Sequence, residues 1–395
     1  MLNIIIIIFI YINGRNLCYC VIVQDKTEIQ ALMFANRLQK RFRHLKKWAQ
    51  RANIGAFRLY DRDIPEIPLV LDFYGDVAQL QEAALSGALY KRPYEKDDNE
   101  EEHWLLSMKN SASLALGIKP EYIFLKQRKR QRGISQYEKM DETHFTKIIN
   151  EGNLVFRVNL SDYLDTGLFP DRRLLRVMVR NEAAGKKVLN LFSYTGSFSV
   201  YAASGGAVST DSIDLSNTYL NWARDNFSLN GFSANLLPRL DQQMQTHVYT
   251  TNANDEKKTI ITDFHRSRVG AHQLIRYDVL EFIEKAAAAK MRWDIIILDP
   301  PAFSNSKKMA DNFDLQRDIK EMLNQCLKLL APGGKIFLSI NMRTKAPIAA
   351  ELEEDLCRQS LPHTANAHVT DLENKIADED FKGRKIPKAF LITVE

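Results

Sequence analysis

Apolar and polar residues follow two different periods along this chain, and the change from one to the other divides it into two parts. Over residues 26–50, apolar positions recur every three or four residues with Lys and Arg between them, which predicts an amphipathic helix with a basic face. Strands at 56–60, 69–74 and 122–126 and a helix at 104–116 follow. These elements predict a small α+β domain that ends near residue 150.

Beyond residue 150, short runs typical of buried strands alternate with helical segments. The strand-like runs are 187–192, 209–214, 293–299 and 335–340, and helices are predicted at 218–229 and 314–330. Strands without polar alternation are buried on both faces, so this part is predicted to be a parallel sheet covered by helices. The polar stretch 241–272 interrupts the rhythm and predicts a surface insertion.

Composition adds limits to this picture. The chain has 395 residues with 45% hydrophobic and 26% charged residues, which is typical of a globular protein with a large and a smaller domain. The apolar segment 2–12 is too short to span a bilayer and lacks the flanks of a signal peptide, so it is interpreted as an appended segment without an assigned role. The predicted division is therefore 1–24, 25–150 and 151–395.

The cysteines and histidines do not indicate a metal site. Cys18, Cys20, Cys326 and Cys357 match neither a zinc pattern nor a disulfide framework, which favours reduced thiols in a cytoplasmic protein. The eight histidines include no H-E-x-x-H pair. We therefore expect no metal.

Positive charge is concentrated in two clusters, although the formal net charge of the chain is only +5. Segments 37–48 and 126–132 are rich in Arg and Lys. Such clusters neutralise phosphates and bind nucleic acid in a salt-sensitive way. The alternative is that each is simply a solvated helix face or loop.

Several predicted strands end in residues suited to a ligand site, since open parallel sheets bind ligands beyond the carboxyl ends of their strands. Gly196, in N-L-F-S-Y-T-G-S, stands where a turn enters a helix. Asp214 ends the next run and is suited to ribose hydroxyls. Asp278 could face an adenine amino group or could cap a helix.

The segment 299–303 (D-P-P-A-F) is the most specific of these strand ends. Pro300 and Pro301 fix the backbone and place the carboxylate of Asp299 at the start of a rigid turn, and Phe303 offers an aromatic face to a flat base. These spacings resemble the class I methyltransferases. A dehydrogenase fits less well, because the turn lacks G-x-G-x-x-G and hydride transfer has no use for D-P-P-x-F.

A closer resemblance rests on segments 35–40, 58–61, 162–169, 190–197 and 299–307. They resemble the C-terminal half of the bacterial bifunctional large-subunit ribosomal RNA methyltransferase K/L, from about residue 32 onward. This implies a Rossmann-like class I fold with a mainly parallel seven-stranded sheet, S-adenosyl-L-methionine (SAM) as cofactor, 23S rRNA as substrate and 7-methylguanosine as product. The family's other half, with a THUMP domain and guanine-N2 activity, has no counterpart here, so a separate protein could supply it.

The chain departs from this family at Pro170 and Arg172, where an apolar residue and a histidine are expected, and in the 241–272 insertion. The resemblance implies that 162–173 wraps the methionine end of the cofactor, although core packing is the alternative for Tyr163 and Phe169. The implied cofactor-binding residues are Tyr163, Thr166, Gly167, Asp171, Arg173, Asn190, Phe192, Ser193, Tyr194, Thr195, Gly196, Asp214, Leu215, Ser216, Asp278, Val279 and Asp299. The catalytic candidates are Asp299, Pro300, Pro301 and Phe303, and the RNA-binding candidates are Arg37, Lys40, Arg41, Lys126, Arg128, Arg130, Arg132, Asn305 and Lys307.

Guanine N7 carries a lone pair and no proton, so its methylation needs no general base. Holding the nucleophile and the methyl group in line, roughly 3–3.5 Å apart, is sufficient. Three alternatives remain. Cytosine-C5 methylation needs a cysteine nucleophile, which the segment 338–343 lacks. Exocyclic-amine methylation, on adenine N6 or guanine N2, is compatible with D-P-P-x-F. An inactive RNA-binding assembly factor would have no need of Asp214.

Overall fold

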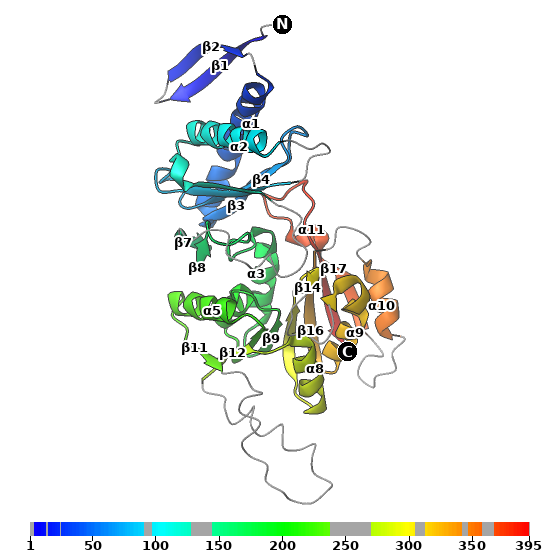
Figure 1. Cartoon of the computed structure of the whole chain (residues 1–395). Helices are drawn as coiled ribbons and strands as arrows, with labels where there is room; N and C mark the ends of the chain where they lie inside the picture. The colour runs from blue at the N-terminus through cyan, green and yellow to red at the C-terminus, as the bar shows by residue number, and fades with distance from the viewer. Residues whose placement is uncertain are drawn as a thin grey trace, which may run out of the picture. The chain divides into compact units, whose positions relative to one another are not determined.

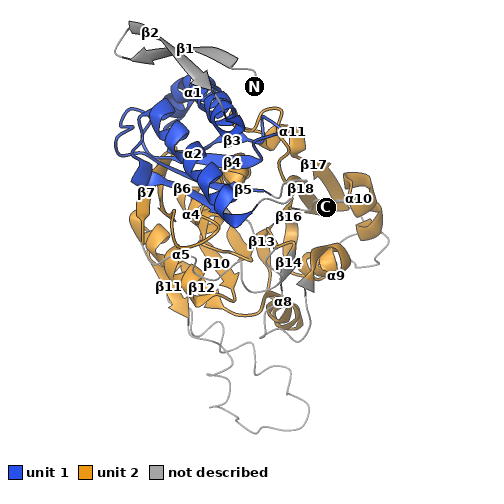
Figure 2. Cartoon of the chain, turned by 45° about the horizontal axis from the view of Figure 1, so that its top comes forward, with its two compact units in different colours: residues 1–130 blue, residues 131–395 orange. Residues whose placement is uncertain are grey.

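The computed structural model describes residues 25–90, 97–127, 144–237, 270–302, 314–341, 347–357 and 367–394, and the strand backbone at 4–12, 15–23, 303–304 and 313. Two compact units divide the chain at residues 130 and 131 (Figure 2). This division lies about twenty residues before the boundary predicted near residue 150. The reason is that β7 (Thr146–Glu151) forms a hairpin with β8 (Leu154–Asn159), which keeps both strands in the second unit.

The first unit packs two helices against a four-stranded sheet. The predicted long helix is α1 (Lys26–Ala52), which buries Phe34, Leu38, Phe42 and Leu45 at the predicted spacing. The sheet order is β3 (Ala56–Asp61), β4 (Leu69–Tyr74), β5 (Ala84–Leu89) and β6 (Ile123–Gln127), antiparallel except for β5 with β6. Helix α2 (Asp98–Leu116) and the short helix η1 (Pro120–Tyr122) precede β6.

Three strands of this unit were not predicted. The segment 2–12 forms β1 (Ile4–Ile12), which pairs antiparallel with β2 (Arg15–Val23) as a hairpin. Strand β5 has the sequence A-L-S-G-A-L, which has little strand character. Its Gly87 lies so close to the neighbouring strand that an added Cβ would stand 2.3 Å from the Val70 carbonyl oxygen.

The second unit is built on an eight-stranded sheet (Figure 1). Its order is β11 (Ala234–Leu237), β12 (His272–Arg276), β10 (Ser209–Asp214), β9 (Lys187–Leu191), β13 (Trp293–Leu298), β16 (Leu330–Ile340), β18 (Lys388–Val394) and β17 (Ala367–Asp371). The first six strands are parallel, and β18 pairs antiparallel with both of its neighbours, β16 and β17. The mainly parallel sheet is confirmed, with one strand more than the seven expected. The additional edge strand, β11, has only four residues and leaves little trace in the sequence pattern.

Helices cover both faces of this sheet, as the buried strands predicted. Neighbouring residues of β9 belong to the cores on opposite faces of the sheet. Leu189 lies in the core with α8 (Val279–Ala288), α9 (Leu315–Leu327) and α10 (Ala349–Cys357). Val188 lies in the core with α3 (Arg173–Glu182), α4 (Ser197–Ser204) and α11 (Glu373–Ile376). Helix α5 (Asn217–Leu229) follows β10. The remaining described elements are the short helix η3 (Pro170–Arg172) and the pair β14 (Phe303–Ser304) and β15 (Phe313–Asp314).

The direction of strand order changes between β9 and β13. Leu191 at the end of β9 lies beside Ile213 of β10 and Leu298 of β13, so these three strands end at one edge. The segments that follow them therefore meet at the switch point, where open sheets bind ligands. Most of the insertion predicted at 241–272 lies outside the described residues.

Candidate active site

The turn after β9 has an unusual backbone. Phe192, Tyr194 and Gly196 all adopt left-handed conformations, with φ of 56°, 51° and 71°. Residues other than glycine rarely hold this conformation, and such strain is concentrated at ligand sites. The amide of Ser193 donates to the carbonyl of Ile213 at 2.9 Å, which joins the turn to the end of β10. This hydrogen bond thus fixes the turn at the switch point of the sheet.

Asp214, the last residue of β10, faces this turn. Its carboxylate accepts hydrogen bonds from the Tyr194 amide at 2.9 Å and from the Ser216 amide at 2.8 Å. Burial raises the pKa of Asp214 to about 6, and the backbone hydrogen bonds oppose this rise. A fixed, half-buried carboxylate at this place is suited to the hydroxyls of a ribose.

The loop that precedes η3 is docked on the same turn. The hydroxyl of Thr195 donates to the carbonyl of Gly167 at 2.6 Å, and the ring of Phe169 stacks on that of Tyr194 with centroids 5.3 Å apart. Gly167 has a φ of +95°, and an added Cβ would lie 2.2 Å from the Trp222 ring. The structure therefore brings together the two segments that the sequence placed around the cofactor.

Asp171 Oδ1, in η3, and Ser193 Oγ, in the turn, are buried and have no hydrogen-bond partner among the described residues. A buried acceptor without a donor is costly, so such atoms indicate a ligand that supplies the missing bonds. The α-amino group of SAM could donate to Asp171, and its ribose hydroxyls could donate to Asp214. The residues present thus fit the cofactor that the resemblance implied.

Asp299, which follows β13, is held by Arg172, a residue that the sequence does not predict as part of the site. The Arg172 guanidinium donates to both carboxylate oxygens of Asp299, from Nε at 3.3 Å and from Nη2 at 3.2 Å. Its Nη1 donates to Asp171 Oδ2 at 2.7 Å. Burial alone would lower the pKa of Arg172, but the charges of Asp171 and Asp299 outweigh this and raise it. The only hint in the sequence was the departure from the family pattern at this position.

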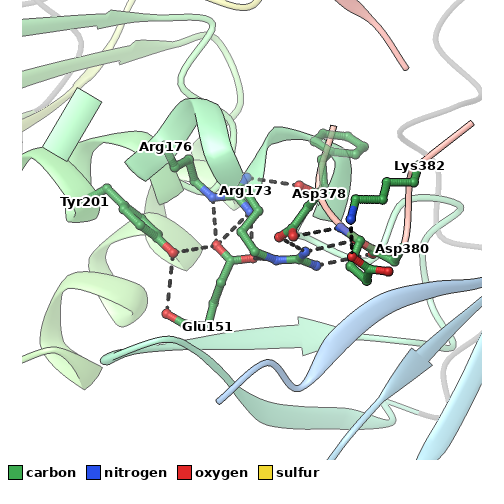
Figure 3. Close-up of polar contacts among 9 residues, drawn as sticks. Glu151, Arg173, Arg176, Tyr201, Asp378, Asp380 and Lys382 are labelled. Atoms are coloured by element: carbon green, nitrogen blue, oxygen red, sulfur yellow. Dashed lines mark hydrogen bonds and ion pairs between the residues drawn. The ribbon is translucent and has the colours of Figure 1, made fainter. Parts of the chain in front are cut away.

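A second set of buried charges lies in the scaffold of the same unit (Figure 3). Arg176 donates to the carboxylate of Glu151 at 2.9 and 2.7 Å, and the Tyr201 hydroxyl donates to Glu151 Oε1 at 2.9 Å. Arg173 lies 2.7 Å from Asp378 and 3.1 Å from Asp380. These contacts join the β7–β8 hairpin, α3, α4 and the segment before β18. Arg173, expected at the cofactor, lies among these scaffold carboxylates.

Other implied cofactor residues also serve the scaffold. Asn190 is buried and donates to the Ser199 hydroxyl at 2.8 Å. Asp278 is the N-cap of α8, accepting from the amides of residues 280 and 281, and Val279 is buried beside it. Ser216 caps α5. The remaining candidates lie on the two docked loops or at the end of β10: Tyr163, Thr166, Gly167, Asp171, Phe192, Ser193, Tyr194, Thr195, Gly196 and Leu215.

Of the catalytic candidates, Pro300 is buried and Pro301 half-buried directly after Asp299. The backbone of Phe303 pairs with Asp314 in β14 and β15, while its side chain lies outside the described residues. The described residues hold no cluster of three or more metal-ligating side chains, and none of their helices is long and apolar enough to cross a membrane.

The RNA-binding candidates of the first unit divide into exposed and engaged residues. Lys40 is exposed on α1, whereas Arg37 donates to Asp63 at 2.6 Å and Arg41 is half-buried. Lys126 is only 8% exposed, which does not suit a phosphate contact. The remaining candidates, Arg128, Arg130, Arg132, Asn305 and Lys307, lie outside the described residues.

Comparison with known proteins bears directly on this site. A family model described as S-adenosylmethionine-dependent methyltransferase matches residues 72–247. Ribosomal RNA large subunit methyltransferase K of Neisseria meningitidis serogroup B is 40% identical over 359 residues, or 91% of this chain and 86% of that protein. Methyltransferase K/L of Shewanella loihica is 39% identical over 347 residues, or 86% of this chain but only 42% of that longer protein.

Solved structures agree on the fold. The crystal structure of SMU.776, a methyltransferase complexed with SAH, has a TM-score of 0.63 at 22% identity and covers 96% of this chain and 85% of its own. A SAM-dependent methyltransferase from Streptococcus mutans has a TM-score of 0.62 at 22% identity, covering 98% and 87%. The fold is therefore the Rossmann-like α/β fold of class I methyltransferases. This chain belongs to the family of S-adenosylmethionine-dependent methyltransferases that includes the ribosomal RNA large subunit methyltransferases K and K/L.

Proposed function

We propose that this chain methylates N7 of a guanine in large-subunit (23S) ribosomal RNA, with SAM as methyl donor. The names of relatives K and K/L support an rRNA substrate. The choice of N7 is the finer part of the proposal, and it identifies this chain with the guanine-N7 half of the K/L proteins. The observation that carries this choice is the bidentate contact of Arg172 with Asp299.

This contact bears on which atom of the base can react. An exocyclic amine must lose a proton as it is methylated, and a group near the amine has to accept that proton. Both oxygens of Asp299 already accept hydrogen bonds from the Arg172 guanidinium, so this carboxylate is held in a fixed bidentate pair instead of facing the amine as a free acceptor. Guanine N7 has no proton to lose. The Asp299–Arg172 pair therefore favours ring-nitrogen methylation over amine methylation.

The chain's own contribution is binding and alignment, while bound SAM supplies an electrophilic methyl group on a sulfonium. Asp214 orients the ribose through its fixed carboxylate, and Asp171 receives the α-amino group. Asp299 and the rigid turn of Pro300 and Pro301 hold the flat base at the adjoining strand end. Alignment of this kind supplies much of the rate increase for an in-line displacement.

Contacts with the RNA backbone are proposed for one exposed face of α1. Lys40, Arg43 and Lys47 are spaced three and four residues apart, and all three are exposed. Such spacing places them along one stripe of the helix. They replace Arg37, whose guanidinium is occupied by Asp63, as our candidates for phosphate contacts in this helix.

A nucleoside assay tests the proposal. The purified chain is incubated with methyl-labelled SAM and unmodified 23S rRNA, and the RNA is digested to nucleosides. Labelled 7-methylguanosine is expected from the wild type and from Asp225→Ala, which removes a half-buried carboxylate of α5 that pairs with Arg157, but not from Asp214→Ala. A labelled N2-methylguanosine or N6-methyladenosine would refute the N7 choice and keep the methyltransferase. No labelled RNA despite SAM binding would refute the rRNA substrate.

A further inference from the structure

Arg172 lies between two carboxylates that come from distant parts of the chain. Asp171 precedes it directly, and Asp299 is 127 positions away, after β13. The arginine side chain is only 8% exposed. Its Nε and Nη2 face Asp299, while its Nη1 faces Asp171. One planar group thus contacts both carboxylates at once.

The geometry of a guanidinium makes this contact directional. Its donors lie in one plane at fixed angles, so a carboxylate held by two of them is fixed in orientation as well as in place. The ring of Phe169 lies 5.6 Å from the Arg172 guanidinium carbon, within reach of a cation–π contact. Arg172 is therefore held by aromatic packing as well as by its two ion pairs.

The two carboxylates serve different reactants in the proposed function. Asp171 has a second oxygen, Oδ1, that is buried without a hydrogen-bond partner among the described residues and is left for a ligand donor. Asp299 begins the turn assigned to the base. We propose that Arg172 is a positioning residue that fixes Asp299 relative to Asp171 and so holds the base-binding turn in register with the cofactor loop.

This inference rests on the proposed function only for the identity of the two reactants. It predicts that, without the two hydrogen bonds from the Arg172 guanidinium to Asp299, the cofactor and the base still bind but are misaligned with each other. Misplacement of reacting groups by about 1 Å can cost about a hundredfold in rate. Lysine keeps the positive charge but, as a point charge, lacks the planar fork that holds Asp299 through two bonds.

The kinetic test compares Arg172→Lys and Arg172→Met with Arg176→Lys, which makes the same change in a buried bidentate pair of the scaffold. We expect kcat to fall about tenfold in R172K and about a hundredfold in R172M. The Kd for SAM and the KM for RNA should change less than about threefold, since the contacts that bind each ligand remain. R176K should lose stability but keep kcat where it is folded. A loss confined to KM, or equal losses of kcat in R172K and R176K, would overturn the proposal.

A double-mutant cycle tests whether Arg172 acts through Asp299. If it does, R172M should lower kcat much less in the Asp299→Asn background than in the wild type, because the group it positions is already altered. Independent, additive losses would refute the proposal. Should R172M fold poorly, the same cycle is run with R172K in its place, since that variant keeps the positive charge of the buried site.

A readout without activity comes from nitrogen NMR of the arginine side chains. The Nε–H signal that disappears in R172K belongs to Arg172, and it should shift in D299N but not in Asp225→Ala. An unshifted signal in D299N would contradict the pairing. The two proposals can fail separately. If the wild type forms another labelled nucleoside, the N7 choice is refuted, but the double-mutant cycle still tests the role of Arg172. If the wild type forms labelled 7-methylguanosine and the cycle is additive, only the role of Arg172 is refuted.

Discussion

The backbone amide of Tyr194 donates a hydrogen bond to the Asp214 carboxylate at 2.9 Å. This bond joins the strained turn after β9 to the end of β10, the two segments that the family resemblance places against the cofactor. The Asp214 carboxylate therefore has two roles: it fixes the turn, and it is the group proposed to hold the ribose. Binding of the cofactor and the shape of the turn should depend on one ionisable side chain.

The first prediction concerns pH. The pKa of Asp214 is about 6 in the folded protein, above its ordinary value of 3.8, so the carboxylate becomes protonated as pH falls through 6. The ionised form is the better acceptor for ribose hydroxyls. The affinity for SAM should therefore weaken about tenfold between pH 7.5 and pH 5, as measured by titration calorimetry.

Asp214→Asn is the matched control for this measurement. It should bind SAM weakly at all pH values, without the additional loss below pH 6, and an equal pH dependence in wild type and variant would exclude Asp214 as its origin. Stability changes in the opposite sense. Because the folded pKa is the higher one, the contribution of this group is present at low pH and is lost as pH rises through 6.

The second prediction concerns the buried pair of Glu151 and Arg176. Glu151→Gln leaves the guanidinium of Arg176 without its charged partner in the interior, which typically costs about 3–5 kcal/mol. Glu182→Gln, which removes the exposed pair with Lys335, should cost less than about 1 kcal/mol. Denaturant unfolding measures both free energies. Similar losses in the two variants would show that the buried pair is not a main support of the unit.

The third prediction concerns Gly167. In Gly167→Ala the new Cβ would stand 2.2 Å from the Trp222 ring of α5 at a φ of +95°, so the loop must move away from α5. We expect SAM affinity to fall at least about tenfold, because a lost hydrogen bond to a charged group costs about 1.5–3 kcal/mol and about 1.4 kcal/mol corresponds to a tenfold change in affinity. Gly185→Ala has a similar φ of +73° with open space around it, so it should cost only about 1 kcal/mol of stability and leave affinity intact. Equal affinities in the two variants would contradict the docking of this loop.

The fourth prediction concerns the exposed stripe of α1. Changing Lys40, Arg43 and Lys47 together to Gln should weaken RNA binding and lower the slope of log affinity against log salt by about 2–3, since each phosphate contact contributes about 0.7–0.9. Arg37→Gln is the control, because its guanidinium is held by Asp63. Filter binding over a range of salt concentrations measures the slopes. An unchanged slope in the triple variant would place the RNA elsewhere.

Much of the fold follows from local patterns. The spacing of apolar residues predicted α1, and the unalternated runs predicted buried parallel strands. The positions of Asp214 and Asp299 at strand ends predicted that they share one edge of the sheet. These predictions succeed because helix and strand periodicity depend on residues within a few positions of one another, and because parallel strands bring their carboxyl ends to the same side.

Sequence patterns thus predict the two-part organisation, the sheet type and which strand ends carry polar residues. Three side-chain positions become apparent only in the folded protein: Arg172 holds Asp299, Arg173 lies among scaffold carboxylates and Lys126 is buried. All three depend on where a long side chain points and on which distant residue lies beside it. Local periodicity carries no such information, because arginine and lysine stems reach as readily toward solvent as toward a buried carboxylate, and packing alone selects between them.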